Sequence, residues 1–189
     1  MYHAGDLIIY GNTGVCRVTE IKTMDFMKTG NEQPYYILSP LFQNCTISAP
    51  VNNSKVFMRP IISKEEAVKL IDDIPSIHAE AYHSHVLRQL TDHYEALIDT
   101  HDCRCLVELT KSIYRKKEFL LKQKKKFGAI DERFMKRAED LLFGELSAAL
   151  EIPRERVTEF IKSRIGKTGC SETGESEPSP SSVKACSMG

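Results

Sequence analysis

The segment from Gly5 to Ile21 constrains the fold of this chain more than any other. On both sides of a short turn, apolar and polar residues alternate, which is the period-two pattern of half-buried β-strands. Asn12 and Gly14 lie in the turn, and both residue types tolerate the positive φ that a tight turn between right-twisted strands needs. The sequence therefore predicts a β-hairpin at the start of the chain.

More short strands are expected up to about residue 60, with turn signals at Gly30–Glu32 and at Gln43–Asn44. The candidate strands are 6–10, 15–22, 34–39, 44–49 and 55–58. So many short strands favour closure, because a barrel leaves no exposed sheet edge. We expect residues 1–60 to form a small β-barrel of the Tudor or SH3-like type.

Residues 61–165 have the periodicity of helices instead, so the predicted fold class is α+β, a barrel followed by an all-helical C-terminal domain. Ser63 and Glu66 form a capping box, Pro75 ends that first helix, and Pro153 suits the first turn of the last one. The expected helices cover about 63–73, 78–99, 103–126, 131–150 and 153–164. Residues 166–189 have almost no large apolar side chain, and we expect a disordered tail there.

Composition narrows the class of protein. The net charge is zero, so the chain as a whole is not a polycation. Asp6 interrupts the first apolar run too early for a signal peptide, and no apolar run is long enough to span a membrane. The six cysteines have no framework spacing, which favours reduced thiols in a cytoplasmic protein. No acid, Ser or Cys pair has catalytic spacing, so we expect neither an enzyme nor a cofactor or small-molecule substrate.

The predicted helix at 103–126 has two faces. An apolar stripe is expected to face the core, and it comprises Leu106, Leu109, Ile113 and Leu120. Basic residues fall on the opposite side, namely Lys111, Arg115, Lys122 and Lys126. A row of long cations can neutralise nucleic-acid phosphates, and Arg133, Lys136 and Arg137 in the next helix could extend it. The alternative is that this is simply the solvent-exposed face of the helix. In that case the last lysines are present because cations near a helix C-terminus interact favourably with the helix dipole.

Several histidines gather between residues 78 and 101, and they raise the alternative of a metal-dependent hydrolase. Two histidines on one helix hold a metal when they are four residues apart. His78, His83, His85 and His93 contain no such pair. The sequence therefore assigns no metal ligand, and elemental analysis of the purified protein would test the hydrolase alternative.

The hairpin, together with Thr46–Val51 and Val56–Pro60, resembles the RNA-polymerase-interacting module of the CarD family of bacterial transcription regulators. Gly11, Thr13 and Cys16 depart from the usual residues of that pattern. A weaker similarity continues through Leu106–Lys116 and Ala138–Leu150. The resemblance implies that the N-terminal module docks on the β subunit of RNA polymerase and that the helical domain contacts promoter DNA at the upstream edge of the bubble, modulating open-complex stability.

For the polymerase contact, the run Cys45–Ala49 could add as an exposed edge to a sheet of the partner. The polymerase-binding candidates are Met24, Thr46, Ile47 and Ser48.

For DNA, the family's tryptophan is absent, and its approximate position falls at Leu87, followed by Arg88. Leu87 or Tyr82 could insert at an unstacked step, or the protein could bind polymerase with only weak DNA contact. The DNA-binding candidates, expected to make non-specific backbone contacts in the nucleoid, are Leu87, Arg88, Lys111, Arg115, Lys122, Lys126 and Arg137. Besides the transcription regulator and the metal-dependent hydrolase, the remaining alternative is a barrel-based protein-interaction adaptor with no DNA role.

Overall fold

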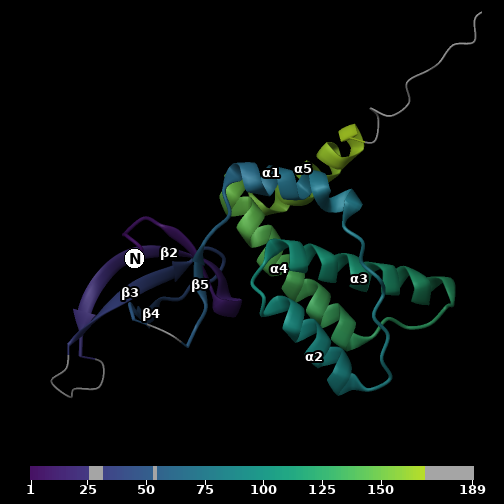
Figure 1. Cartoon of the computed structure of the whole chain (residues 1–189), viewed down its shortest axis with the longest axis horizontal. Helices are drawn as coiled ribbons and strands as arrows, with labels where there is room; N and C mark the ends of the chain where they lie inside the picture. Colours follow the sequence, from purple (N-terminus) through teal and green to yellow (C-terminus); the bar gives the residue numbers. More distant parts are fainter. Residues whose placement is uncertain (26–31, 53–54, 169–189) are drawn as a thin grey trace, which may run out of the picture.

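A computed structural model of the chain describes residues 1–25, 32–52 and 55–168. The N-terminal part is an antiparallel β-sheet and the remainder is helical, so the predicted α+β class is confirmed (Figure 1). The prediction of a disordered tail over 166–189 lies outside the described residues except at 166–168, which belong to the last helix.

The sheet has five strands, and its order is β4-β3-β2-β1-β5. Its members are β1 (Leu7–Tyr10), β2 (Gly14–Met24), β3 (Gln33–Pro40), β4 (Ile47–Pro50) and β5 (Met58–Pro60). The predicted hairpin is confirmed, because β1 pairs with β2 and Tyr10 lies opposite Gly14. Gly11 in the turn has φ +44°, and a Cβ there would lie 2.9 Å from the Val56 side chain, so the turn requires glycine.

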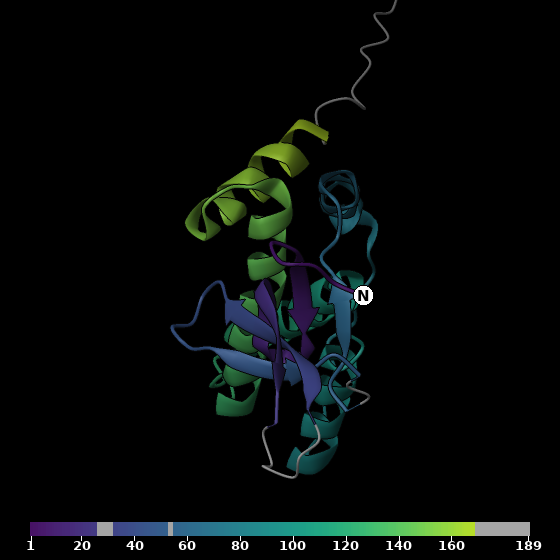
Figure 2. The same ribbon diagram turned by 90° about the vertical axis from the view of Figure 1, so that its left-hand side faces the viewer.

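The predicted barrel closure is not confirmed. Among the described residues, β4 and β5 lie at opposite ends of the sheet and pair only with β3 and β1, respectively. Both strands are short, and β5 makes side-chain contacts with the helical domain, as described below. Figure 2 shows the strong twist of the sheet. Its concave face buries a small core formed by Ile8, Cys16, Val18, Tyr36, Leu38 and Ala49.

Five helices follow, as predicted: α1 (Lys64–Asp73), α2 (Leu87–Ile98), α3 (Cys103–Lys122), α4 (Ala129–Leu150) and α5 (Arg154–Thr168). The capping box at the start of α1 is present, since the Glu66 amide donates to Ser63 Oγ and the Ser63 amide donates to the Glu66 carboxylate. Leu106, Leu109 and Ile113 are buried as predicted, and Leu120 is half-buried.

The predicted helix at 78–99 starts nine residues late, at Leu87. Residues 77–86, which we call the strap, run without helical structure along α3. Side chains of α3 satisfy the strap's carbonyls in place of helical bonds: Ser112 Oγ donates to Glu80 O at 2.6 Å, and Arg115 donates to Ala79 O at 2.6 Å. Because these carbonyls already accept hydrogen bonds from side chains, the strap does not require helical hydrogen bonds to satisfy them.

The predicted helix at 103–126 ends at Lys122, four residues early. Lys124 has φ +53°, the Lys124 amide donates to Leu121 O, and the Lys125 amide donates to Leu120 O. These two bonds form a Schellman motif, which ends a helix through a left-handed residue. Lys126 therefore lies beyond α3 and cannot share its face.

An ionic cluster holds the helical domain together from inside. Lys116 Nζ lies 2.8 Å from Asp131 Oδ1, and the Tyr94 hydroxyl donates to the same oxygen at 2.8 Å. The three residues come from α3, α4 and α2, respectively, and all are nearly inaccessible to solvent. Burial, followed by the hydrogen bond to Asp131, raises the pKa of Tyr94 above its ordinary value, so this hydroxyl stays a donor.

We expect Lys116→Ala to lower the free energy of unfolding by about 3–5 kcal/mol, because it leaves the Asp131 carboxylate buried without its counter-ion. Chemical denaturation measures this loss. The exposed Lys122→Ala on the same helix is the matched control and should change stability by less than about 0.5 kcal/mol. A loss below about 1 kcal/mol for Lys116→Ala would contradict the role given to the pair.

Candidate functional site

Strand β4 is a free edge of the sheet in the described part of the chain. The predicted addition of a partner strand along Cys45–Ala49 requires such an edge. Thr46 just before it and Ser48 within it are exposed, whereas Ile47 is half-buried against the concave core. Met24 is not at this edge, because it ends β2 and β3 lies between β2 and β4. The structure thus brings Thr46, Ile47 and Ser48 together and leaves Met24 apart.

The direction of the backbone groups along β4 decides what the edge can bind. The Val51 amide donates to Pro34 O across the ladder at 2.9 Å. Since successive residues of a strand point their amides to opposite sides, the amides of Ile47 and Ala49 face β3 and that of Ser48 faces outward. Pro50 has no amide to offer. The edge therefore presents the Ser48 N–H and the carbonyls of Ser48 and Pro50 to a partner.

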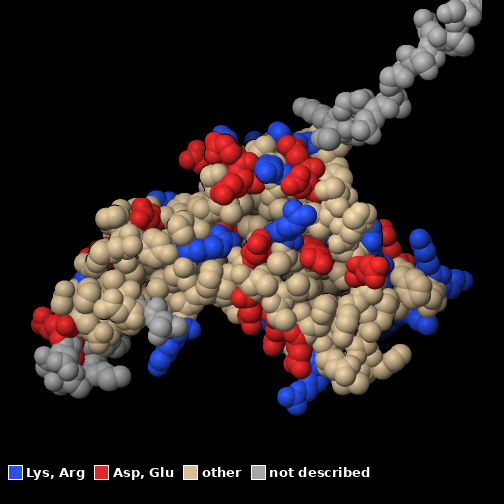
Figure 3. Space-filling model, in the orientation of Figure 1, with Lys and Arg blue, Asp and Glu red and all other residues tan. Residues whose placement is uncertain are grey.

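The second candidate surface is the basic turn, which we define as Lys122, Lys124, Lys125 and Lys126. All four side chains are exposed, and no acidic residue lies between Phe119 and Gly128. Figure 3 shows the basic atoms gathered at the end of the helical domain that points away from the sheet. Arg137 is half-buried two turns into α4.

Lys111 and Arg115 have other partners than solvent. Lys111 Nζ donates to the carbonyls of Ile74 and Ile77, both at 2.6 Å, and Arg115 holds the strap through Ala79. Burial, and then the charge of Arg115, lowers the pKa of the Lys111 ammonium. The expectation that all four predicted phosphate-binding cations are exposed on one face is therefore wrong for Lys111, which is half-buried, and for Lys126, which is not on the helix.

The strap ends at Val86, and α2 begins at Leu87; both side chains are exposed and apolar, 52% and 65% accessible. Leu87 begins α2, and the neighbouring Arg88 lies 3.8 Å from Asp92 in an exposed ion pair. Tyr82 is not available for insertion, since it stacks on His93 with ring centroids 3.9 Å apart. His83 contacts the Phe119 ring of α3 edge-on, which places the end of the strap beside the last turns of α3. Leu87 was among the DNA-binding residues predicted from the sequence, and Val86 was not.

Two of the histidines stack on aromatic rings. His93 stacks on Tyr82 and His101 stacks on Phe57. Within the described ranges no three His, Cys, Asp or Glu side chains are arranged to hold a metal ion. Nor does any helix among these residues have the length and apolar character that crossing a membrane requires.

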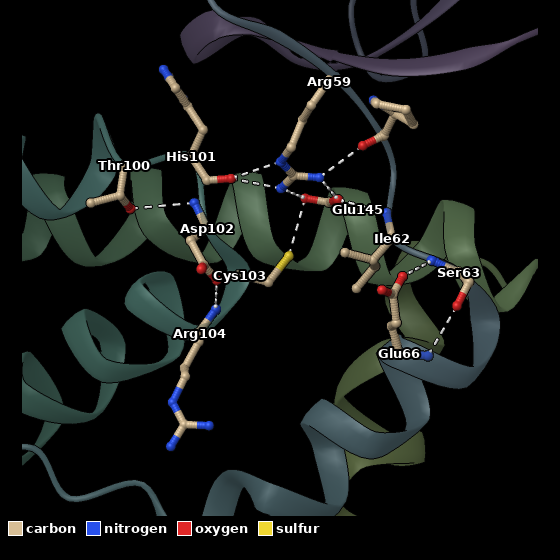
Figure 4. Close-up of polar contacts among 11 residues, drawn as sticks. Arg59, Ile62, Ser63, Glu66, Thr100, His101, Asp102, Cys103, Arg104 and Glu145 are labelled. Carbon is tan, nitrogen blue, oxygen red and sulfur yellow. Dashed lines mark hydrogen bonds and ion pairs between the residues drawn. The ribbon is translucent and has the colours of Figure 1, made fainter.

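A buried ion pair joins the sheet to the helices, and Figure 4 shows it in detail. Arg59 of β5 meets Glu145 of α4 in a bidentate contact, with Nη1–Oε1 at 2.5 Å and Nη2–Oε2 at 2.8 Å. Arg59 also donates to the His101 carbonyl from Nε and Nη2, at 3.0 and 2.6 Å. Glu145 is 2% accessible and accepts two more bonds, from the Ile62 amide and from Cys103 Sγ. One carboxylate thus links the last strand, the interdomain connection and the start of α3.

The comparison with protein families gives residues 2–62 an assignment, because they match the model of the CarD-like/TRCF RID domain. The match covers about a third of the chain, and we call residues 2–62 the RID domain after it. Such a domain is a protein-interaction module, and it indicates a transcription-related protein that interacts with the β subunit of RNA polymerase. A comparison with curated proteins found no match.

The RID domain ends at the residues that surround the buried ion pair. Ile62, its last matched residue, donates its amide to Glu145. The sheet domain and the helices make two further contacts. Gly144 leaves room for the Phe42 ring, which a Cβ would approach to 3.1 Å, and Asn12 Nδ2 donates to Asp99 at 3.3 Å. A lone acid within the apolar run 141–150 was a signal in the sequence, but its partner Arg59 could not be paired with it without the fold.

Removing the cation from this junction should be costly. We expect Arg59→Met to destabilise the protein by about 3–5 kcal/mol, because Glu145 then remains buried without a counter-ion. The double variant Arg59→Met with Glu145→Met should recover most of that loss, since no charge stays behind. Denaturant unfolding of the three proteins measures it. If the double variant is no more stable than the single one, packing rather than charge controls the junction.

The junction should also respond to pH through His101. Burial lowers the pKa of this imidazole, the nearby Asp99 opposes the shift, and the Arg59 charge adds to it. Because the unfolded chain takes up the proton at a higher pH than the folded one, stability should fall as the pH drops through about 6.5. When the pH is lowered from 7.5 to 5.5, we expect the midpoint temperature of unfolding to fall less in His101→Asn than in the unmodified protein. Asparagine suits the left-handed backbone at this position, where φ is +52°. Equal slopes would contradict the assignment.

Proposed function

We propose that this protein binds the β subunit of RNA polymerase through the β4 edge of its RID domain and contacts promoter DNA at the upstream edge of the bubble with its helical domain. It would act in the cytoplasm on polymerase at the nucleoid. The observation that carries the proposal is the free edge strand within a domain of the RID family. Binding the open complex better than the closed one would modulate its stability without any chemical step.

The edge offers main-chain hydrogen bonds and places few demands on the side chains of the partner. One sheet extends another in this way. Ser48 is the decisive residue, because its amide faces away from β3. Ile47 is a poor position for a test, since a proline there would remove an amide that the RID domain uses in its own sheet.

Ser48→Pro removes the outward amide and leaves the ladder to β3 intact, so the domain should fold and binding to the isolated β subunit should fall about tenfold or more. Ser48→Ala is the matched control, because it keeps the amide, and it should bind normally. Surface plasmon resonance with the full chain measures both. Unchanged binding by a folded Ser48→Pro protein would place the docking site elsewhere on the RID domain.

Two features support the contact with DNA. The basic turn is a compact group of exposed cations, and no acidic residue lies between Phe119 and Gly128, which suits phosphate neutralisation. Val86 and Leu87 are exposed apolar side chains at the start of α2, where they could insert at an unstacked base step. The contact of His83 with Phe119 brings these features to the same end of the helical domain.

Lys111 and Arg115 take a different role in this proposal. Through their bonds to the carbonyls at 74, 77 and 79, they hold the strap along α3 and so fix the point at which Val86 and Leu87 leave the surface. Lys122 and Lys126 remain candidates for direct phosphate contact, joined by Lys124 and Lys125. Arg88 and Arg137 remain candidates at the margin of this surface.

Changing Lys122, Lys124, Lys125 and Lys126 to Ala should shorten the lifetime of the open complex while docking on polymerase is unchanged. Each lost phosphate contact should lower the slope of log affinity against log salt by about 0.9. The matched control removes four exposed cations from α1 and α5, namely Lys64, Lys69, Arg156 and Lys162. If both quadruple variants leave lifetime and salt slope unchanged, the adaptor without a DNA role is the better description.

A further inference from the structure

The open seam of the sheet contains a groove. Among the described residues, β4 and β5 do not pair and form the two ends of the sheet. A solvent-open groove of about 720 Å³ lies there. Its walls come from both sides of the seam, with Val51 just after β4 and Met58 and Pro60 in β5. Tyr36 of β3 and Tyr2 of the N-terminal segment complete the apolar lining.

The lining of the groove is amphipathic. The rings of Tyr2 and Tyr36 lie with their centroids 5.7 Å apart, and the Tyr2 amide donates to the Tyr36 hydroxyl at 3.1 Å. Asp6 is the carboxylate that lines the groove, and Met1, which carries the α-amino group of the chain, lines it as well. Among the described residues no Lys or Arg side chain lines it. Asp6 Oδ2 accepts a bond from the His3 amide at 2.7 Å, which orients the carboxylate. Aromatic faces beside a carboxylate suit a cation on an apolar stem.

The position of the groove connects it with the β4 edge. Ile47 and Val51 pack against the concave core, so every second residue of β4 faces the side of the sheet on which the groove lies. A strand added to β4 would follow the same alternation, and every second side chain of that strand would point over the seam. A long side chain from such a strand is the occupant that this geometry admits.

We propose that the groove binds an arginine or lysine side chain of the strand that adds to β4. The stem lies against Tyr2 and Met58, and the cationic head meets the Asp6 carboxylate. This inference rests on the proposed function, because it specifies one anchor of the same docking site. In this arrangement, main-chain hydrogen bonds to β4 supply the affinity. The groove selects a cationic side chain at one position of the partner strand.

Two measurements test the groove. In the first, the full chain carrying Asp6→Asn binds the isolated β subunit about tenfold more weakly, with a smaller salt dependence, because a charge-assisted bond is lost. Asparagine keeps an oxygen that accepts from the His3 amide, so the fold survives. Glu20→Gln, which removes an exposed carboxylate of β2 outside the groove, is the control and binds normally. Tyr2→Leu, which removes an aromatic face, weakens binding several-fold.

The second measurement does not need polymerase. N-acetyl-arginine-N-methylamide is titrated into the full chain, and the amide signals of Tyr2 and Asp6 shift, whereas the norleucine analogue causes no such shift. If Ser48→Pro abolishes binding to β but Asp6→Asn has no effect and no amide shifts, the groove assignment is overturned and the proposed function stands. If the unmodified protein fails to bind β while the arginine analogue shifts Tyr2 and Asp6, the proposed function is overturned and the cation site stands.

Discussion

The ion pair between Arg59 and Glu145 determines how this protein can act as a unit. A strand residue and a helix residue that are far apart in the sequence share two hydrogen bonds, and the Glu145 carboxylate is almost closed to water. The Ile62 amide, the His101 carbonyl and the Cys103 thiol complete the cluster, and burial followed by the nearby Glu145 carboxylate raises the pKa of Cys103 so that it stays a thiol. Because charges in such a site must keep their partners, the angle between the RID domain and the helices is fixed, and a partner held by one domain is presented to the other in a defined geometry.

The strap is the second structural device. Its carbonyls are bound by Lys111, Ser112 and Arg115, and its rings contact α2 and α3 through Tyr82 and His83. An extended segment fixed at so many points delivers Val86 and Leu87 to the surface without the flexibility of a free loop. The cations that hold it are therefore positioning residues, and the cations of the basic turn are those left for a phosphate backbone.

Much of the fold was predictable because its signals are local. Period-two alternation gave the hairpin, the Ser63–Glu66 capping box gave the start of α1, and the stripe of Leu106, Leu109 and Ile113 gave the buried face of α3. The errors have tertiary causes. The strap was predicted as helix because nothing in its own residues shows that α3 side chains satisfy its carbonyls. Barrel closure was expected from strand number alone, whereas β5 is engaged by the helical domain. The buried pairs Lys116–Asp131 and Arg59–Glu145 join residues whose proximity only the fold creates.

The central claim is that the RID domain docks by extending its sheet at β4, and amide hydrogen exchange with and without the β subunit of polymerase tests it most directly. In the free protein the amides of Ile47 and Ala49 face β3 and should exchange slowly, while the outward amide of Ser48 should exchange fast. Saturation with the β subunit should slow Ser48 selectively, by the factor that a new main-chain hydrogen bond confers. If binding saturates and the exchange of Ser48 is unchanged, the sheet is not extended at this edge and the account of docking is wrong.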